Sequence, residues 1–104
     1  MAEVVWADPA LNDLRAVVEY IARDSRTYAE RFARRVLQAT RRLETFPRSG
    51  RVVPEFGEGC LRELIYGSYR IIYLLRSDTC YVIALVHASR RLLERLRPGE
   101  WDIS

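Results

Sequence analysis

Apolar side chains recur at helical spacing near the start of the chain. A short β-prone run, Glu3–Trp6, comes first. It is followed by Asp8 and Pro9, which predict a helix start because aspartate caps a first turn and proline fits the first helical position. The apolar positions that follow have a 3-4-3 spacing, at Leu11, Leu14, Val18 and Ile21. This spacing predicts an amphipathic helix that ends near Asp24.

A second amphipathic helix is expected directly afterwards. Ser25 or Thr27 can cap its start, and Phe46 and Pro47 end it. Its apolar face consists of Ala29, Phe32, Val36, Ala39 and Leu43. Because the connection between the two helices is so short, they are expected to form an αα-hairpin.

The second helix also carries arginines away from its apolar face. They are Arg31, Arg34, Arg35, Arg41 and Arg42. A basic helix face of this kind is either an ordinary solvated surface, which is the more common case, or a surface that binds nucleic acid. The pattern alone leaves both interpretations open.

The second half of the chain changes to strand-like runs. A loop rich in proline, glycine and charge, residues 47–59, contains a short extended piece around Val52 and Val53. Three strands are predicted after it, Cys60–Tyr66, Tyr69–Arg76 and Cys80–His87, joined by turns of hairpin length. The final segment permits a short helix through Leu92, Leu93 and Leu96, which Pro98 and Gly99 would end.

These elements predict one α+β domain over residues 1–104. It has an N-terminal strand, an αα-hairpin and a three-stranded antiparallel meander, with a short C-terminal helix at the end. The helices are expected to pack on one face of the antiparallel sheet.

Alternation within the last two predicted strands makes both faces of the sheet apolar. In the middle strand, one face carries Tyr69, Ile71, Tyr73 and Leu75. In the last strand, one face carries Tyr81, Ile83, Leu85 and His87. Since the helical hairpin can cover only one face, the other is expected to be partly covered by the C-terminal segment or left open to a partner.

The charged residues give the sheet a candidate recognition surface. The net charge is +3 and all 17 basic residues are arginine, so every cation is a planar fork suited to carboxylate or phosphate. Arg70 is interpreted either as half of an ion pair with Glu63 across the hairpin, or as part of a basic and aromatic concavity that binds RNA or an acidic protein segment. The second interpretation places six residues on one surface: Arg62, Tyr69, Arg70, Tyr73, His87 and Arg90.

Several classes of protein are not expected. The apolar runs are shorter than the roughly 20 residues of a membrane span, and the N-terminus lacks the pattern of a signal peptide. A cytoplasmic protein without membrane contact is therefore predicted. Cys60 and Cys80 form no metal-binding pattern, so each is expected to be a small buried residue, and no metal or cofactor is expected.

Four segments together resemble the RelE/ParE superfamily of toxins from type II toxin–antitoxin systems. They are DLRAVVEYIARDSRTYAERF, LETFPRSGRVVPE, RELIYGSYRIIYLL and VIALVHASR, and the resemblance runs from about Asp8 to Arg91. It implies a growth-inhibiting bacterial toxin of the kind that stabilises plasmids. It also implies a cognate acidic antitoxin, through which alone the toxin would meet operator DNA. Such an antitoxin is expected to place a helix in an apolar groove and to add a strand to the sheet edge.

The resemblance covers two kinds of target. RelE-like members cut mRNA on the ribosome, and Arg70 matches the arginine that many of them place at the scissile phosphate. A metal-independent nuclease would then use Glu63, Arg70, His87 and Arg90. The strand that carries Glu63 has no lysine, however, and no tyrosine follows Tyr81.

The RE pair and the H-x-x-R ending look more like the ParE branch, whose members inhibit DNA gyrase. We therefore expect ParE-like gyrase inhibition, with no catalytic residue. The alternatives are a RelE-like ribosome-dependent endoribonuclease and a non-toxic binding module that only pairs with the antitoxin.

Overall fold

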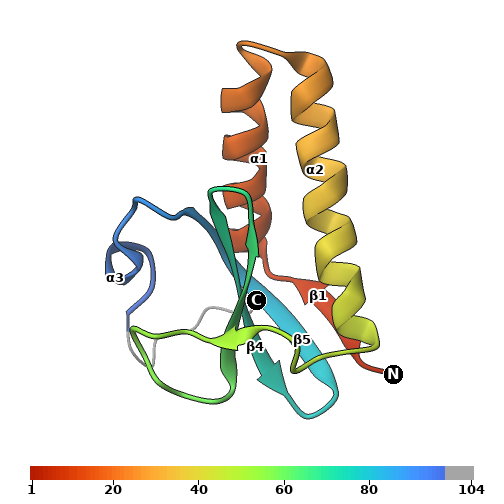
Figure 1. Cartoon of the computed structure of the whole chain (residues 1–104), viewed down its shortest axis with the longest axis vertical. Helices are drawn as coiled ribbons and strands as arrows, with labels where there is room; N and C mark the ends of the chain where they lie inside the picture. Colours follow the sequence, from red (N-terminus) through yellow and green to blue (C-terminus); the bar gives the residue numbers. More distant parts are fainter. Residues whose placement is uncertain (98–104) are drawn as a thin grey trace.

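The computed structural model describes residues 1–97, which form a sheet with a helical hairpin packed against it (Figure 1). The elements in chain order are β1 (Glu3–Trp6), α1 (Asp8–Ala22), α2 (Arg26–Arg41), the 3-10 turn η1 (Arg42–Glu44), β2 (Arg51–Val52), β3 (Leu61–Tyr66), β4 (Tyr69–Arg76), β5 (Thr79–His87) and α3 (Leu92–Arg95). The predicted α+β fold, with its short C-terminal helix, is confirmed. The predicted end of that helix at Pro98 and Gly99 lies outside the described residues.

The sheet has five strands in the order β1-β5-β4-β3-β2. The meander β3-β4-β5 is antiparallel as predicted, and β2 extends it at one edge. At the other edge β1 pairs parallel to β5, with Glu3 opposite Thr79 and Trp6 opposite Val82. The strand alternation did not predict this parallel pair, because alternation says nothing about which strands become neighbours.

The helical hairpin begins directly after β1. Ala7 still donates its backbone N–H to Val82 O at 2.9 Å, so Ala7 and not Asp8 precedes the first turn of α1. The predicted cap at Asp8 is therefore wrong by one residue, although a carboxylate in the first turn still complements the helix dipole. Ser25 caps α2 as predicted, since its Oγ accepts the N–H of Tyr28 at 3.1 Å.

Buried apolar side chains form two clusters, one on each face of the sheet. The cluster beneath α1 and α2 includes Leu14, Phe32, Val36, Ile71 and Val82. The cluster on the other face includes Val53, Ile72, Val86, Leu92 and Leu96. Of the two alternatives expected for the second face, the first is the one observed: the C-terminal segment covers it through α3, together with residues 53–56, and the face is not left open to a partner.

A β-bulge in β5 changes which side chains face the helices. Ile72 lies opposite Ala84 and Tyr73 opposite Val82, so Ile83 has no direct partner. An extra residue in one strand reverses the alternation beyond it. The predicted common face of Tyr81, Ile83, Leu85 and His87 is therefore wrong. The first two lie with the α3-side cluster, whereas Leu85 and His87 face α1 and α2.

β1 pairs with β5 only as far as Trp6, which lies opposite Val82. Beyond that point, the side chains of Asp13 and Arg95 bond to the free backbone groups of β5. The Asp13 carboxylate accepts the backbone N–H of Leu85 at 3.0 Å. Arg95 pairs with Asp13 at 3.0 Å and donates to Ile83 O at 3.2 Å. These bonds satisfy backbone groups that would be costly to leave unpaired away from water. Because Asp13 belongs to α1 and Arg95 to α3, they also hold both helices against the sheet.

The remaining expectations concern cysteines, metals and membranes. Cys80 is buried as predicted, and burial raises the pKa of its thiol, but Cys60 is exposed in the loop before β3. Both are free thiols. Within residues 1–97 we find neither a cluster of His, Cys, Asp and Glu suited to a metal ion nor a helix long and apolar enough to span a bilayer.

Candidate functional site

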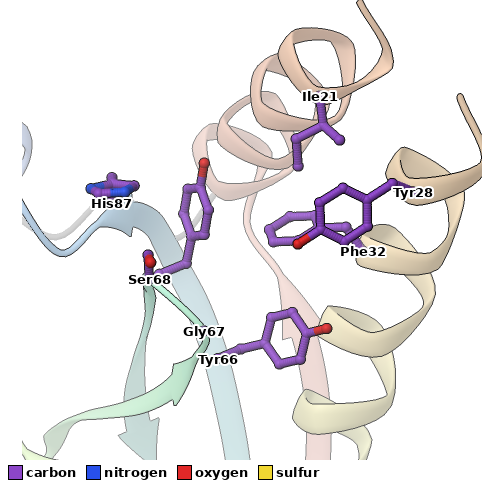
Figure 2. A pocket seen from close by; sticks show the side chains of 8 residues that line it. Ile21, Tyr28, Phe32, Tyr66, Gly67, Ser68 and His87 are labelled. Carbon is purple, nitrogen blue, oxygen red and sulfur yellow. The ribbon is translucent and has the colours of Figure 1, made fainter. Parts of the chain in front are cut away.

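An aromatic pocket lies where the hairpin of helices meets the β3–β4 turn. Its volume is about 420 Å³, and Figure 2 shows side chains from α1, α2 and the sheet converging on it. The lining residues are Ile21, Tyr28, Phe32, Tyr66, Gly67, Ser68, Tyr69 and His87. We call this cavity the aromatic pocket.

The two-residue turn between β3 and β4 shapes the floor of the aromatic pocket. Gly67 has a φ of +56°, a conformation that glycine adopts without strain. The tight turn brings Tyr66 and Tyr69 opposite each other, and both rings meet Phe32 edge to face, with centroids 5.7 and 5.1 Å away. Burial raises the pKa of Tyr69 above its usual value. These three rings form the aromatic floor of the pocket.

His87 lies at the end of β5, at the mouth of the aromatic pocket. Its ring packs edge to face on Tyr69, with centroids 5.1 Å apart. Its Nδ1 accepts the backbone N–H of Ser89 at 3.1 Å, so the neutral ring carries its proton on Nε2. A second hollow of about 240 Å³ continues from here towards α1 and brings Arg90 beside Tyr69 and His87.

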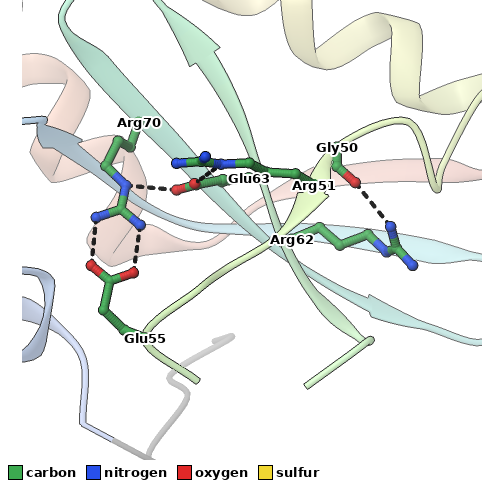
Figure 3. A network of polar contacts seen from close by, with 6 residues as sticks. All are labelled: Gly50, Arg51, Glu55, Arg62, Glu63 and Arg70. Atoms are coloured by element: carbon green, nitrogen blue, oxygen red, sulfur yellow. Dashed lines mark hydrogen bonds and ion pairs between the residues drawn. The ribbon is translucent and has the colours of Figure 1, made fainter. Parts of the chain in front are cut away.

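Arg70 faces the other side of the sheet and is held by two carboxylates (Figure 3). Its Nε donates to Glu63 at 2.6 Å, and its two terminal nitrogens donate to Glu55 at 2.7 and 2.8 Å. Arg51 pairs with the second carboxylate oxygen of Glu63. The residue Glu63 is only 1% exposed. We call these four residues the carboxylate–arginine cluster.

The electrostatics of this cluster favour the charged forms. Hydrogen bonds from Arg70 hold the pKa of the Glu55 carboxyl below its ordinary value. Hydrogen bonding to Glu55, and then to Glu63, raises the pKa of Arg70. The predicted ion pair between Arg70 and Glu63 is confirmed. Glu55 was not predicted as a partner, because it lies in a loop where no periodicity shows its direction.

Arg62 and Tyr73 are also engaged inside the protein. Arg62 donates to the carbonyls of Gly59 and Gly50, each at 2.9 Å, and Figure 3 shows it pointing away from Arg70. Tyr73 is fully buried, with its hydroxyl donating to Pro47 O at 2.8 Å and accepting from Gly50 N at 3.0 Å. Burial raises the pKa of Tyr73.

The single concavity predicted for six residues is therefore wrong. The structure brings together Tyr69, His87 and Arg90, whereas Arg70 lies across the sheet and Tyr73 and Arg62 support the loop after α2. The reason is the pleat: neighbouring residues such as Tyr69 and Arg70 point to opposite faces. Sequence reasoning missed Tyr28 and Tyr66 as pocket residues. The available signal was their position in the sequence, with Tyr28 just after the start of the second helix and Tyr66 directly before the Gly67–Ser68 turn.

The close contact at Gly50 makes a testable prediction about stability. A Cβ at this position would lie 2.7 Å from Glu63 O and 2.7 Å from the ring and hydroxyl of Tyr73. We expect Gly50→Ala to lower the free energy of unfolding by about 1–3 kcal/mol because of overpacking, measured by urea denaturation. Gly59→Ala is the control, since nothing lies within 4 Å of its Cβ. Equal stability of both variants would contradict the packing described.

The fold defines a small α+β protein in which a helical hairpin covers one face of a five-stranded sheet. The family model described as "ParE toxin of type II toxin-antitoxin system, parDE" matches residues 4–92. Toxin RelE2 of Caulobacter vibrioides is 35% identical over 91 residues, which are 86% of this chain and 99% of that protein. The chain therefore belongs to the RelE/ParE superfamily of type II toxin–antitoxin toxins.

A solved structure shows the same fold. It is titled "Chromosomal ParDE TA system from P. aeruginosa", and the match has a TM-score of 0.68 at 14% sequence identity. The match covers 84% of this chain and 96% of that one. At this identity the likeness shows the fold alone.

Proposed function

We propose that this toxin arrests growth by inhibiting DNA gyrase in the cytoplasm, without cleaving RNA. The observation that carries the proposal is the engagement of Arg70, whose guanidinium nitrogens are bonded to Glu55 and Glu63. An arginine held by two carboxylates in this way is not available to a scissile phosphate. Together with the match to the ParE family model, this supports the ParE branch, for which gyrase is the expected target.

The distribution of the nuclease candidates supports the same conclusion. RNA cleavage needs a base, a cation at the phosphate and an acid, all around one group. Glu63 and Arg70 are the two buried residues of the carboxylate–arginine cluster, whereas His87 and Arg90 lie on the opposite face of the sheet. With the sheet between them, the four side chains do not converge on one phosphate.

The antitoxin is proposed to bind at the aromatic pocket. The pocket offers an apolar floor for a helix of the antitoxin, and Arg90 lies beside its mouth to meet an acidic side chain. The outer edges of β1 and β2 have no strand beside them among residues 1–97, so either edge can accept a strand from the antitoxin. Operator DNA would be reached through the antitoxin.

A supercoiling assay tests the proposed target. Purified toxin at excess over gyrase is expected to block supercoiling of relaxed plasmid, and addition of the antitoxin is expected to restore it. The matched control is toxin with the antitoxin already bound. Full supercoiling activity at excess free toxin would overturn the proposal.

One observation favours a second candidate, the RelE-like endoribonuclease. The 35%-identical relative is named Toxin RelE2, and His87 is an exposed titratable group next to Arg90. Primer extension on translated mRNA after toxin induction separates the two candidates. New cuts that disappear in His87→Ala would support the nuclease. Unimpaired growth after induction would instead indicate a binding module that only pairs with the antitoxin.

A further inference from the structure

Three arginines of the sheet differ from three arginines on or just after α2 in what their guanidinium groups bind. Arg51, Arg62 and Arg70 are bonded to protein carboxylates or carbonyls. Arg31 and Arg35 are exposed, as is Arg42 just after the end of α2, and none of their three guanidinium groups has a hydrogen bond or ion pair with a residue in the described part of the chain. Arg51, Arg62 and Arg70 are therefore structural, whereas the guanidinium groups of Arg31, Arg35 and Arg42 are available to a partner.

The three available arginines lie along one line of the helix surface. Arg42 has helical backbone angles, with φ of −62° and ψ of −21°, so it continues the geometry of α2. At 3.6 residues per turn, positions 31, 35 and 42 fall within about 40° of one another and span about 16 Å along the axis. Gln38 lies on the same line. We call Arg31, Arg35, Gln38 and Arg42 the arginine stripe.

The neighbouring flank of α2, about 60–80° around the helix from Arg31, has a different character. There Arg41 lies 3.9 Å from Glu44, and Glu30 lies one helical turn before Arg34. Arg41 also lines a hollow beside β1 together with Leu37 and Thr40. Positive charge on this flank is thus partly offset by acidic side chains, whereas the arginine stripe contains no acid.

We infer that the arginine stripe binds the phosphate backbone of double-stranded DNA. A guanidinium fork suits a phosphate, and a stripe about 16 Å long matches about five base pairs at 3.4 Å rise. None of the four stripe residues is aromatic, and the exposed ring nearest to them, that of Tyr28 one turn before Arg31, belongs to the wall of the aromatic pocket, so a duplex fits the stripe better than a single strand. Contacts to phosphate carry no sequence information, so the binding is sequence-independent.

This contact goes beyond gyrase inhibition, because it needs neither gyrase nor the antitoxin. Through this contact the toxin would bind DNA directly, and DNA is the substrate of gyrase, the enzyme that the toxin is proposed to inhibit. The aromatic pocket and the neighbouring flank of α2 take no part in this contact. Binding of DNA by this toxin chain alone, without gyrase or antitoxin, therefore tests the inference.

Two variants with equal net charge test the inference. The stripe variant carries Arg31→Gln, Arg35→Gln and Arg42→Gln, and the control carries Arg26→Gln, Arg34→Gln and Arg41→Gln. Glutamine keeps a high helix propensity, and circular dichroism checks that each variant is folded. Binding to a labelled duplex of about 20 random base pairs is measured by fluorescence anisotropy between about 50 and 200 mM salt.

The wild type is expected to bind the duplex with an affinity that falls steeply as salt rises. Loss of three phosphate contacts should reduce the slope of log K against log salt by about 2.7 in the stripe variant, and by less than about 1 in the control. An equal decrease of the slope in both variants would show that net charge alone explains the effect, and it would overturn the inference.

Two other outcomes would also overturn it. One is no measurable binding to the duplex at about 50 mM salt, and the other is tighter binding to single-stranded or double-stranded RNA of the same length. Supercoiling assays with the same two variants are scored separately. Failure of DNA binding and failure of gyrase inhibition can therefore be told apart.

Discussion

Replacing Arg70 with methionine is expected to lower the free energy of unfolding by about 3–5 kcal/mol. The change leaves Glu63 buried with only the largely exposed Arg51 as partner, and it leaves Glu55 without its bidentate contact. Removing one member of a buried charged group is costly because the remaining charges lose compensation without regaining water. Urea denaturation at pH 7 measures the effect.

Two matched variants test whether the loss belongs to the carboxylate–arginine cluster. Arg76→Met removes an exposed arginine from the same strand, one whose guanidinium group has no hydrogen bond or ion pair among residues 1–97, and should change stability by less than about 0.5 kcal/mol. Arg51→Met should cost less than Arg70→Met, because the Arg51 side chain is 62% exposed. Similar losses in Arg70→Met and Arg76→Met would show that the cluster does not stabilise the fold.

The same cluster predicts how stability depends on pH. Hydrogen bonds from Arg70 lower the pKa of Glu55 from 4.5, so folding favours the carboxylate. This contribution is present above about pH 4.5 and is lost as pH falls through the folded-state pKa. The stability difference between wild type and Arg70→Met should therefore narrow as pH falls from 5 towards 3.

Replacing Tyr28 with aspartate is expected to weaken antitoxin binding by about 30-fold or more. Tyr28 is 54% exposed on the wall of the aromatic pocket, and an aspartate there would oppose an acidic antitoxin and remove aromatic contact area. The fold should tolerate the change, because position 28 is the third residue of α2, where a carboxylate complements the helix dipole. Titration calorimetry with the purified antitoxin measures the dissociation constant.

Phe46→Asp is the matched control for Tyr28→Asp. Phe46 is 61% exposed and does not line the aromatic pocket, so the same aromatic-to-acid change should leave antitoxin binding within about threefold of wild type. In cells, co-expressed antitoxin should rescue growth for the control and fail for Tyr28→Asp. Unchanged affinity in Tyr28→Asp would exclude the aromatic pocket as the antitoxin site.

The arginines of this protein have two different roles. Arg70 lies on an inner strand and resembles a catalytic arginine in sequence, yet it joins Glu55 in the loop after β2 to Glu63 on β3. Residues 53–56 are thereby held over the second face of the sheet. The three arginines of the arginine stripe have guanidinium groups with no hydrogen bond or ion pair in the described part of the chain, and a polyanion can reach them.

The local pattern of the sequence determined the elements and much of their packing. Ser25 predicted the start of α2, alternating residues predicted β3, β4 and β5, and the stripe through Phe32 and Val36 predicted the face that α2 buries. These features depend on neighbours within a few residues, where helical and strand periodicities hold. The family followed from motifs that are themselves local.

Only the tertiary structure decided how the faces are used. One extra residue in β5 placed His87 on the helix side, and a loop of irregular backbone placed Glu55 against Arg70. The second face was closed by residues 53–56 and α3, which share no periodicity with the sheet that they cover. Such contacts are made between residues far apart in the chain, so their geometry is set by packing and charge compensation and cannot be read from local spacing.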